Sequence, residues 1–341
     1  MQHERDSQSL TLDRRSFVGA ATAALAGAQL GFAPAARAAP IGSHTSFASL
    51  KQVEAGLLDV GYAEAGPAEG RPVILLHGWP YDIHSYVDVA PLLASKGYRV
   101  IVPYLRGYGS TRFLTSDTVR NGQQSVVALD IIHLMDALKI QSAILGGFDW
   151  GSRTADIIAA LWPRRCKALV SVSGYLITNV KAQQQPLLPK AELGWWYQYY
   201  FSTRRGVLGY TRYRDAFNRL IWTTVSPKWR FDDATYKRTA QAFANPDHVA
   251  IVIHNYRWRL GLAKGEAKYD DLENRLFASP VITVPTITIA SDFDGALASG
   301  AAYRSKFSGE YAHRVLPGIG HNVPQEAPQA FAKAIADANA L

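Results

Sequence analysis

The chain has 341 residues, of which 48% are hydrophobic and 19% are charged, and its formal net charge at pH 7 is +8. This is the composition of a globular protein with enough length for one large domain or two modest ones. The single cysteine, Cys166, excludes an intrachain disulfide framework and any metal site built from several cysteines. No zinc-protease, EF-hand or P-loop pattern occurs, so we expect neither a metal nor another cofactor.

Residues 1–38 are predicted to be a twin-arginine export signal that is separate from the fold. Arg14-Arg15 precedes an Ala-rich stretch, and Ala36-Arg37-Ala38 has the A-x-A pattern of a cleavage site. The stretch is only weakly apolar, which makes it a poor membrane-spanning helix. We therefore expect the twin-arginine export machinery to be a partner and the processed protein to be periplasmic or secreted.

From residue 50 onward, predicted strands and helices alternate. Apolar runs predict strands at 73–76, 99–102, 142–148, 168–172, 283–290 and 313–316, and apolar residues at helical spacing predict helices at 84–95, 124–138, 152–161 and 325–340. Short strands that are apolar throughout and joined by helices form parallel sheets covered on both faces. The expected fold class is therefore α/β.

Residues 176–280 interrupt this alternation. They lack the strand pattern, are rich in aromatic residues, and hold sixteen Lys and Arg against nine Asp and Glu. We expect a mostly helical insertion between two strands of the sheet. Its basic surplus fits a solvated surface or the attraction of acidic substrates or membranes. No nucleic-acid partner is expected, because no nucleic-acid-binding motif accompanies the charge.

Residues able to do chemistry follow the ends of the predicted strands, where ligands of parallel sheets bind. They are His77-Gly78-Trp79-Pro80, Asp149, Asp292 or Asp294, and His321. Asp149 lies between Gly147 and Gly151, in the pattern of a sharp strand-to-helix turn that usually carries Ser. A carboxylate there can attack a saturated carbon and form an ester, and it needs no base to lose its proton. The alternative is that Asp149 only caps a helix.

Together these motifs resemble the α/β-hydrolase fold family, specifically its branch of epoxide hydrolases and dehalogenases. The resemblance covers residues 50–341 and rests on Gly147 to Gly151, His77 to Pro80, Arg106-Gly107-Tyr108-Gly109, and Gly320-His321 with Glu326-Ala327-Pro328. It implies a mostly parallel, eight-stranded sheet with helices on both faces. Residues 39–175 and 281–341 would form this core, and residues 176–280 would form a helical cap domain.

The resemblance also implies the catalytic roles. Asp149 would be the nucleophile and His321 the base that activates water to hydrolyse the ester. Asp294, in Ser291-Asp292-Phe293-Asp294, would orient the His321 ring, with Asp292 as the alternative. The alternative is that His321 is a structural histidine whose ring is hydrogen-bonded within the protein and has no catalytic role.

Further residues would bind the reacting oxygens. Family resemblance assigns the oxyanion of the second step to the backbone N–H groups of Trp79 and Trp150. Tyr197 and Tyr256 resemble the two cap tyrosines that hydrogen-bond the epoxide oxygen, although both can also be packing aromatics. His77 is expected to be a structural hydrogen-bonding residue, with a role as a base or a contact to the substrate as its alternatives.

Two residues also fit a dehalogenase. Trp150 is shared with haloalkane dehalogenases, in which the indole N–H holds the halide. Arg153 occupies the place of an arginine that clamps a carboxylate in fluoroacetate dehalogenases, and its alternative is a buried structural ion pair. One residue departs from the pattern of epoxide hydrolases, because Tyr81 follows Trp79-Pro80 at a position where many of them carry Glu.

The sequence therefore predicts a hydrolase that forms an alkyl-enzyme ester and opens an epoxide to a vicinal diol. Two alternatives remain open, namely a dehalogenase acting on a haloalkane or haloacid, and a hydrolase-fold protein that binds a ligand without catalysis. The aromatic cap predicts an apolar or aromatic small-molecule substrate, with water as the co-substrate.

Overall fold

The computed structural model describes residues 47, 49–297 and 299–341. The predicted export signal therefore lies outside the described residues. Among the helices of the described part, none is both long and apolar enough to cross a membrane.

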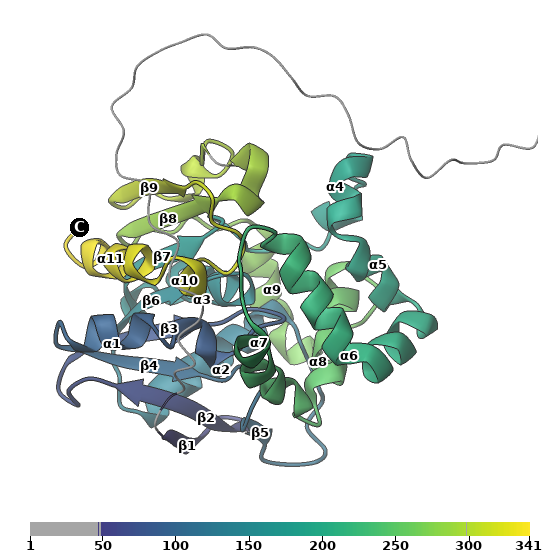
Figure 1. Cartoon of the computed structure of the whole chain (residues 1–341), viewed down its shortest axis with the longest axis horizontal. Helices are drawn as coiled ribbons and strands as arrows, with labels where there is room; N and C mark the ends of the chain where they lie inside the picture. Colours follow the sequence, from purple (N-terminus) through teal and green to yellow (C-terminus); the bar gives the residue numbers. More distant parts are fainter. Residues whose placement is uncertain (1–46, 48, 298) are drawn as a thin grey trace, which may run out of the picture. The chain divides into compact units, whose positions relative to one another are not determined.

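Within the described residues, nine strands form one sheet in the order β1-β2-β4-β3-β6-β7-β8-β9, with β5 beside β2 (Figure 1). The bounds are β1 Leu50–Ala55, β2 Leu58–Ala65, β3 Arg71–Leu76, β4 Tyr98–Pro103, β5 Arg112–Phe113, β6 Ala143–Gly147, β7 Cys166–Val172, β8 Thr286–Ser291 and β9 Tyr311–Leu316. Neighbours from β4 to β9 run parallel, whereas β2 pairs antiparallel with β1, β4 and β5. The mostly parallel sheet is confirmed, and the two-residue β5 is an addition to the eight strands expected.

The sheet is covered on both faces, which explains its apolar central strands. Helices α1 (Val89–Ala94) and α11 (Pro328–Ala338) contact each other and cover one face, and α2 (Gln124–Ala137) and α3 (Trp150–Leu161) cover the other (Figure 1). Residues 73–76 of β3, for example, are fully buried.

Two predicted helices are each divided in the structure. The segment 84–95 forms a 3-10 helix, η1 (Ile83–Tyr86), followed by α1. The last predicted helix is divided into α10 (Val323–Glu326) and α11. The break falls at Ala327, whose φ is −140°, because the residue before a proline, here Pro328, avoids the helical conformation.

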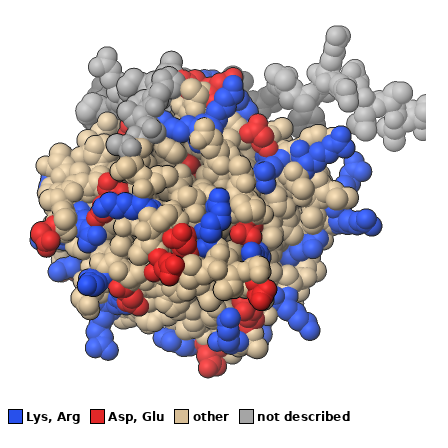
Figure 2. Space-filling model, turned by 90° about the horizontal axis from the view of Figure 1, so that it is seen from below, with Lys and Arg blue, Asp and Glu red and all other residues tan. Residues whose placement is uncertain are grey.

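The segment between β7 and β8 is helical, as expected. It contains α4 Pro189–Gly194, α5 Trp196–Ser202, α6 Arg204–Val225, α7 Asp233–Ala240, α8 His248–Arg259 and α9 Asp270–Phe277, with 3-10 turns η3 Ala182–Gln184, η4 Gln241–Ala244 and η5 Ala267–Tyr269. We call residues 176–280 the cap, and its limits as a domain stay a prediction. Figure 2 shows one face of the molecule, on which Lys and Arg predominate at the side that holds α5 and α6 in Figure 1.

The topology gathers the candidate residues at one edge of the sheet. Strands β3 and β6 are parallel neighbours whose last residues, Leu76 and Gly147, are paired. Strands β8 and β9 run in the same direction on the far side of β7. The segments that follow these four strands therefore leave the same edge, where ligands of parallel sheets bind.

Candidate active site

Asp149 lies at the apex of the turn between β6 and α3. Its φ is 53°, a left-handed value that costs a non-glycine residue conformational energy. A Cβ added at Gly147 would lie 2.4 Å from the Gly151 carbonyl carbon, and one added at Gly151 would lie 1.8 Å from Leu76 O. Glycine at both positions thus permits the tight turn at whose apex Asp149 lies.

Hydrogen bonds distinguish the two oxygens of the Asp149 carboxylate. Oδ1 accepts the Trp79 backbone N–H at 2.8 Å, and Oδ2 lies 3.5 Å from His321 Nε2. Burial acts to raise the pKa of Asp149, but the hydrogen bond and charge of His321, the charge of Arg153 and the Trp79 N–H outweigh burial and leave the pKa below its usual value. Asp149 is therefore ionised at neutral pH, as a nucleophile must be.

The loop that carries His321 is held by a buried carboxylate. Glu326 accepts the N–H groups of Gly320 and Asn322, at 2.7 and 3.1 Å, and the Ser226 hydroxyl at 2.6 Å. Ser226 Oγ in turn accepts the backbone N–H of His321 at 2.9 Å. Since Ser226 directly follows α6, these bonds fix the backbone of the His321 loop against the cap.

The two candidate acids occupy different places. Asp294, in the 3-10 helix η6 (Asp292–Leu297), accepts the Ser291 N–H at 2.6 Å and lines the same cavity as Asp149 and His321. Asp292 is exposed and forms an ion pair with Lys228 at 2.6 Å. The structure thus brings Asp294 to the site and leaves Asp292 at the surface.

Neither acid contacts the imidazole of His321. Its Nδ1 is buried and has no hydrogen-bond partner among the described residues. The ring packs on Phe293, with ring centroids 4.3 Å apart. The orienting role of Asp294 therefore stays a prediction.

The two candidate cap tyrosines lie together near Asp149. The rings of Tyr197, on α5, and Tyr256, on α8, are 5.3 Å apart, and they lie 5.0 and 5.1 Å from the Trp79 ring. Burial and the charge of Asp149 raise the pKa of both hydroxyls, so both keep their protons at neutral pH and can act as donors. In this structure, however, neither residue lines the cavity that contains Asp149.

Trp150 offers two donors beside Asp149. It is the first residue of α3, so its backbone N–H is among those that have no acceptor within the helix. Its indole Nε1 is buried and has no hydrogen-bond partner among the described residues. The Tyr256 ring lies 5.8 Å from the Trp150 ring.

His77 has the contacts of a structural residue. Its Nε2 accepts the Leu105 N–H at 3.2 Å, and its Nδ1 lies 3.0 Å from Gly78 O. Burial lowers the pKa of His77 to about 4, so the ring is neutral near pH 7 and Nδ1 carries the proton. Tyr81, where related enzymes carry Glu, is buried and stacks on Trp222 at 5.0 Å.

A cavity of about 550 Å³ opens onto the pair formed by Asp149 and His321. Its lining mixes apolar groups with charges and consists of Asp149, Arg153, Ser173, Tyr175, Leu176, Ile177, Thr178, Gln183, Lys190, Ala191, Gly194, Trp195, Arg259, Phe293, Asp294 and His321. Arg153 projects from the first turns of α3 and donates from Nε to Leu176 O at 3.0 Å. The cavity has the size of small-molecule sites.

Comparison with known proteins agrees with the fold. Residues 71–328 match the family described as alpha/beta hydrolase fold. The chain belongs to the α/β-hydrolase fold family. A crystal structure from Klebsiella pneumoniae, of a protein with the provisional name epoxide hydrolase, is 59% identical, covers 88% of this chain and 100% of its own, and superposes with a TM-score of 0.85.

Relatives named epoxide hydrolase and haloalkane dehalogenase each align with part of this α/β-hydrolase chain. An epoxide hydrolase of Caballeronia sordidicola is 37% identical over 115 residues, which is 34% of this chain and 33% of the relative. A haloalkane dehalogenase of Mycobacterium marinum is 30% identical over 152 residues, which is 40% of this chain and 49% of the relative. The predicted branch is thus confirmed, although each alignment spans less than half of the named relative.

The sequence analysis missed three residues of this α/β-hydrolase site. Glu326 was noted only as part of a motif, and Ser226 and Arg259 were given no role. Glu326 had a detectable signal, because it lies five residues after His321 in a Pro-flanked segment. Ser226 and Arg259 had none, because the ends of α6 and α8 reach the site only through the packing of the cap.

Proposed function

We propose that this protein is an epoxide hydrolase that opens its substrate to a vicinal diol through an ester on Asp149. The observation that carries the proposal is the pair formed by Asp149 and His321, with Oδ1 at 2.8 Å from the Trp79 N–H and Oδ2 at 3.5 Å from His321 Nε2. The likeness to proteins named epoxide hydrolase supports the choice of electrophile.

In the first step, Asp149 Oδ2 attacks a carbon of the epoxide. Oδ2 is the attacking atom because the Trp79 N–H already holds Oδ1, which becomes the carbonyl oxygen of the ester. The ring C–O bond breaks, and its electron pair moves to the epoxide oxygen. Tyr197 or Tyr256 then donates a proton to this oxygen, which requires one of the two hydroxyls to reach the cavity when substrate binds.

In the second step, His321 Nε2 takes a proton from a water molecule, and the resulting hydroxide attacks Cγ of Asp149. The N–H groups of Trp79 and Trp150 stabilise the negative charge on Oδ1. The tetrahedral intermediate then collapses, and the bond between Cγ and Oδ2 of Asp149 breaks. Oδ2 leaves with the substrate as an alkoxide, which takes the proton of the new carboxylic acid and becomes the diol. The proton on His321 returns to the tyrosinate, so epoxide and water give diol.

Two variants separate these steps. Asp149→Ala should abolish turnover of styrene oxide, because no ester can form. His321→Gln should form the ester but not hydrolyse it, which adds the mass of the substrate to the protein. His254→Gln is a suitable control, because His254 lies outside the cavity and bonds to backbone groups of Gly122 and Lys264. Wild-type turnover by Asp149→Ala would refute the mechanism.

A dehalogenase is the second candidate, because the buried Trp150 Nε1, which has no hydrogen-bond partner in the part of the chain that the structure describes, is a donor suited to a halide. Free halide released from a panel of haloalkanes measures this activity. The double variant with Tyr197→Phe and Tyr256→Phe discriminates between the reactions, because only the alkoxide needs a proton. We expect it to slow epoxide opening by about 100-fold or more and halide displacement much less.

A further inference from the structure

The cavity that holds Asp149 is also lined by two arginines that form no ion pair with a carboxylate among the described residues. Arg153 is only 7% exposed, and Arg259, the last residue of α8, has a buried Nε without a hydrogen-bond partner among the described residues. No carboxylate oxygen of the described residues lies within 4 Å of either guanidinium. Because a buried cation is costly unless an anion accompanies it, such a pair requires an explanation.

The two arginines lie near each other and near the nucleophile. Burial and the positive charge of Arg259 lower the pKa of Arg153 to about 10, and the charge of Asp149 opposes this change. The guanidinium carbon of Arg259 lies 5.6 Å from the centre of the Tyr256 ring. The two guanidinium groups form a positive region beside the carboxylate that would become the ester.

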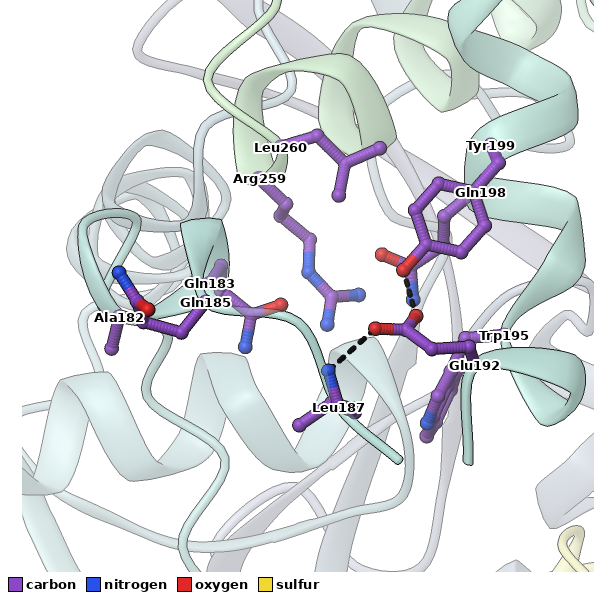
Figure 3. A pocket seen from close by; sticks show the side chains of 10 residues that line it. All are labelled: Ala182, Gln183, Gln185, Leu187, Glu192, Trp195, Gln198, Tyr199, Arg259 and Leu260. Atoms are coloured by element: carbon purple, nitrogen blue, oxygen red, sulfur yellow. Dashed lines mark hydrogen bonds between the residues drawn. The ribbon is translucent and has the colours of Figure 1, made fainter. Parts of the chain in front are cut away.

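Arg259 also borders a second hollow on the cap side of the cavity. In Figure 3 its guanidinium lies in the middle of this hollow, near the Gln183 side chain. Glu192 is the acid of this hollow, and its oxygens already accept the Leu187 N–H, at 2.6 Å, and the Tyr199 hydroxyl. Both oxygens of Glu192 thus already have donors, and Glu192 forms no ion pair with Arg259, so the Arg259 guanidinium keeps donors free for a ligand.

We propose that Arg153 and Arg259 bind a carboxylate group carried by the epoxide substrate. This inference rests on the proposed function and narrows its substrate class to epoxides of organic acids. A planar guanidinium donates two parallel hydrogen bonds that match the two oxygens of a carboxylate. The apolar lining formed by Tyr175, Ile177 and Trp195 would accept the hydrocarbon body of the same molecule.

The reaction itself favours this arrangement. Before the attack, Asp149 supplies a negative charge close to Arg153. When the ester forms, that charge disappears, so the substrate carboxylate becomes the main counter-charge of the two arginines. The intermediate would thus be held at two points, by its ester bond and by its carboxylate, while water attacks.

Matched acids and amides test the inference. The substrates are 3-phenylglycidate and 4-oxiranylbenzoate, which place the carboxylate near to and far from the epoxide, together with the carboxamide of each and neutral styrene oxide. For at least one pair, we expect wild-type kcat/KM to be at least tenfold higher for the acid than for the amide. Arg259→Gln should lower this acid-to-amide ratio at least tenfold, and Arg259→Lys should lower it less.

The matched control is Arg205→Gln. Arg205 is an exposed residue of α6 outside the cavity, so its loss removes one cap charge without touching the site. This control should keep the wild-type acid-to-amide ratio, which excludes a general effect of the basic cap. An equal fall in the ratio for Arg205→Gln and Arg259→Gln would overturn the inference.

Other outcomes separate the inference from the proposed function. If wild type hydrolyses the amides and styrene oxide but prefers neither acid, the inference fails and the epoxide hydrolase stands. If no epoxide reacts and His321→Gln forms no ester, the proposed function fails. In that case, calorimetry measures the binding of each diol acid and each diol amide to wild type. Equal dissociation constants for acid and amide refute the arginine site, and tighter binding of an acid supports it.

Discussion

At the scale of single residues, the turn that carries Asp149 depends on positions where only glycine fits. A Cβ at Gly151 would lie 1.8 Å from Leu76 O, and backbone atoms of a central strand cannot move aside cheaply. We expect Gly151→Ala to lower the free energy of unfolding by more than about 2 kcal/mol and to abolish turnover. Urea unfolding followed by circular dichroism measures the first effect.

Gly194→Ala is the control for this substitution. A Cβ at Gly194 would meet no atom within 4 Å, and the residue ends the short helix α4. Its replacement should change stability by less than about 0.5 kcal/mol. Equal stabilities of the two variants would mean that the turn around Asp149 is looser than the structure indicates.

Another single residue, Asp156 of α3, should govern how stability depends on pH. Burial raises the pKa of Asp156 to about 8, although the Leu176 N–H, at 2.8 Å, partly opposes it. In the unfolded chain the pKa is about 3.9. Between these two pKa values, the folded protein holds a proton on Asp156 that the unfolded chain lacks. The stability that this proton contributes is therefore complete below about pH 4 and is lost as the pH rises to about 8.

Asp156→Asn removes that titration and should therefore stabilise the folded protein most at high pH. The difference in Tm between Asp156→Asn and wild type should increase in favour of the variant from pH 5 to pH 8. The control Asp117→Asn, at an exposed position, should show no such trend. Differential scanning fluorimetry across this range measures both, and parallel Tm curves for Asp156→Asn and wild type would contradict the assignment.

At the scale of elements, the end of α6 positions the loop that follows β9. Ser226 Oγ accepts the His321 N–H at 2.9 Å and donates to Glu326 at 2.6 Å. Ser226→Ala leaves the His321 N–H without its partner, which costs about 1–3 kcal/mol for a buried group left unpaired, and it removes one of the three hydrogen bonds to Glu326. We expect kcat to fall about tenfold or more and the ester on Asp149 to accumulate, because the displaced His321 activates water poorly.

The readout is protein mass during turnover together with kcat. Thr223→Ala, on the same helix, is the control, because the exposed Thr223 hydroxyl bonds only to backbone carbonyls of α6. It should behave like wild type. If Ser226→Ala lowers stability but leaves kcat and the amount of ester unchanged, Ser226 supports the fold and not the position of His321.

Elements were predictable where one local signal dominates. The central strands are buried throughout, so their apolar runs were visible in the sequence. Strand β1 is mostly exposed, and the turn at Gly56, with φ of 61°, joins it to β2 without a strong pattern. Motifs tied to backbone geometry, such as the glycines around Asp149, were equally visible. The paths of α6 and α8 depend on packing between distant segments, and therefore Ser226 and Arg259 were missed.

At the scale of the whole molecule, buried hydrogen bonds tie the cap to the core. Trp222 Nε1 donates to Pro80 O at 2.7 Å, and Trp79 Nε1 donates to the Tyr210 hydroxyl at 2.9 Å. Asn245 Nδ2 donates to Thr111 O at 2.7 Å. The first two bonds join cap residues to the loop that carries the Trp79 backbone N–H. The cap is therefore bound to the core by interactions that a separately folding lid would lack.

We expect cap and core to unfold in one cooperative transition. Scanning calorimetry of the chain should give one peak whose calorimetric and van't Hoff enthalpies agree. Trp222→Phe should lower Tm because Pro80 O loses its buried donor, yet it should keep a single peak, because the other bonds between cap and core remain. Two resolved peaks in wild type would show that the cap unfolds independently, and the cap would then be free to open around the substrate while the sheet stays folded.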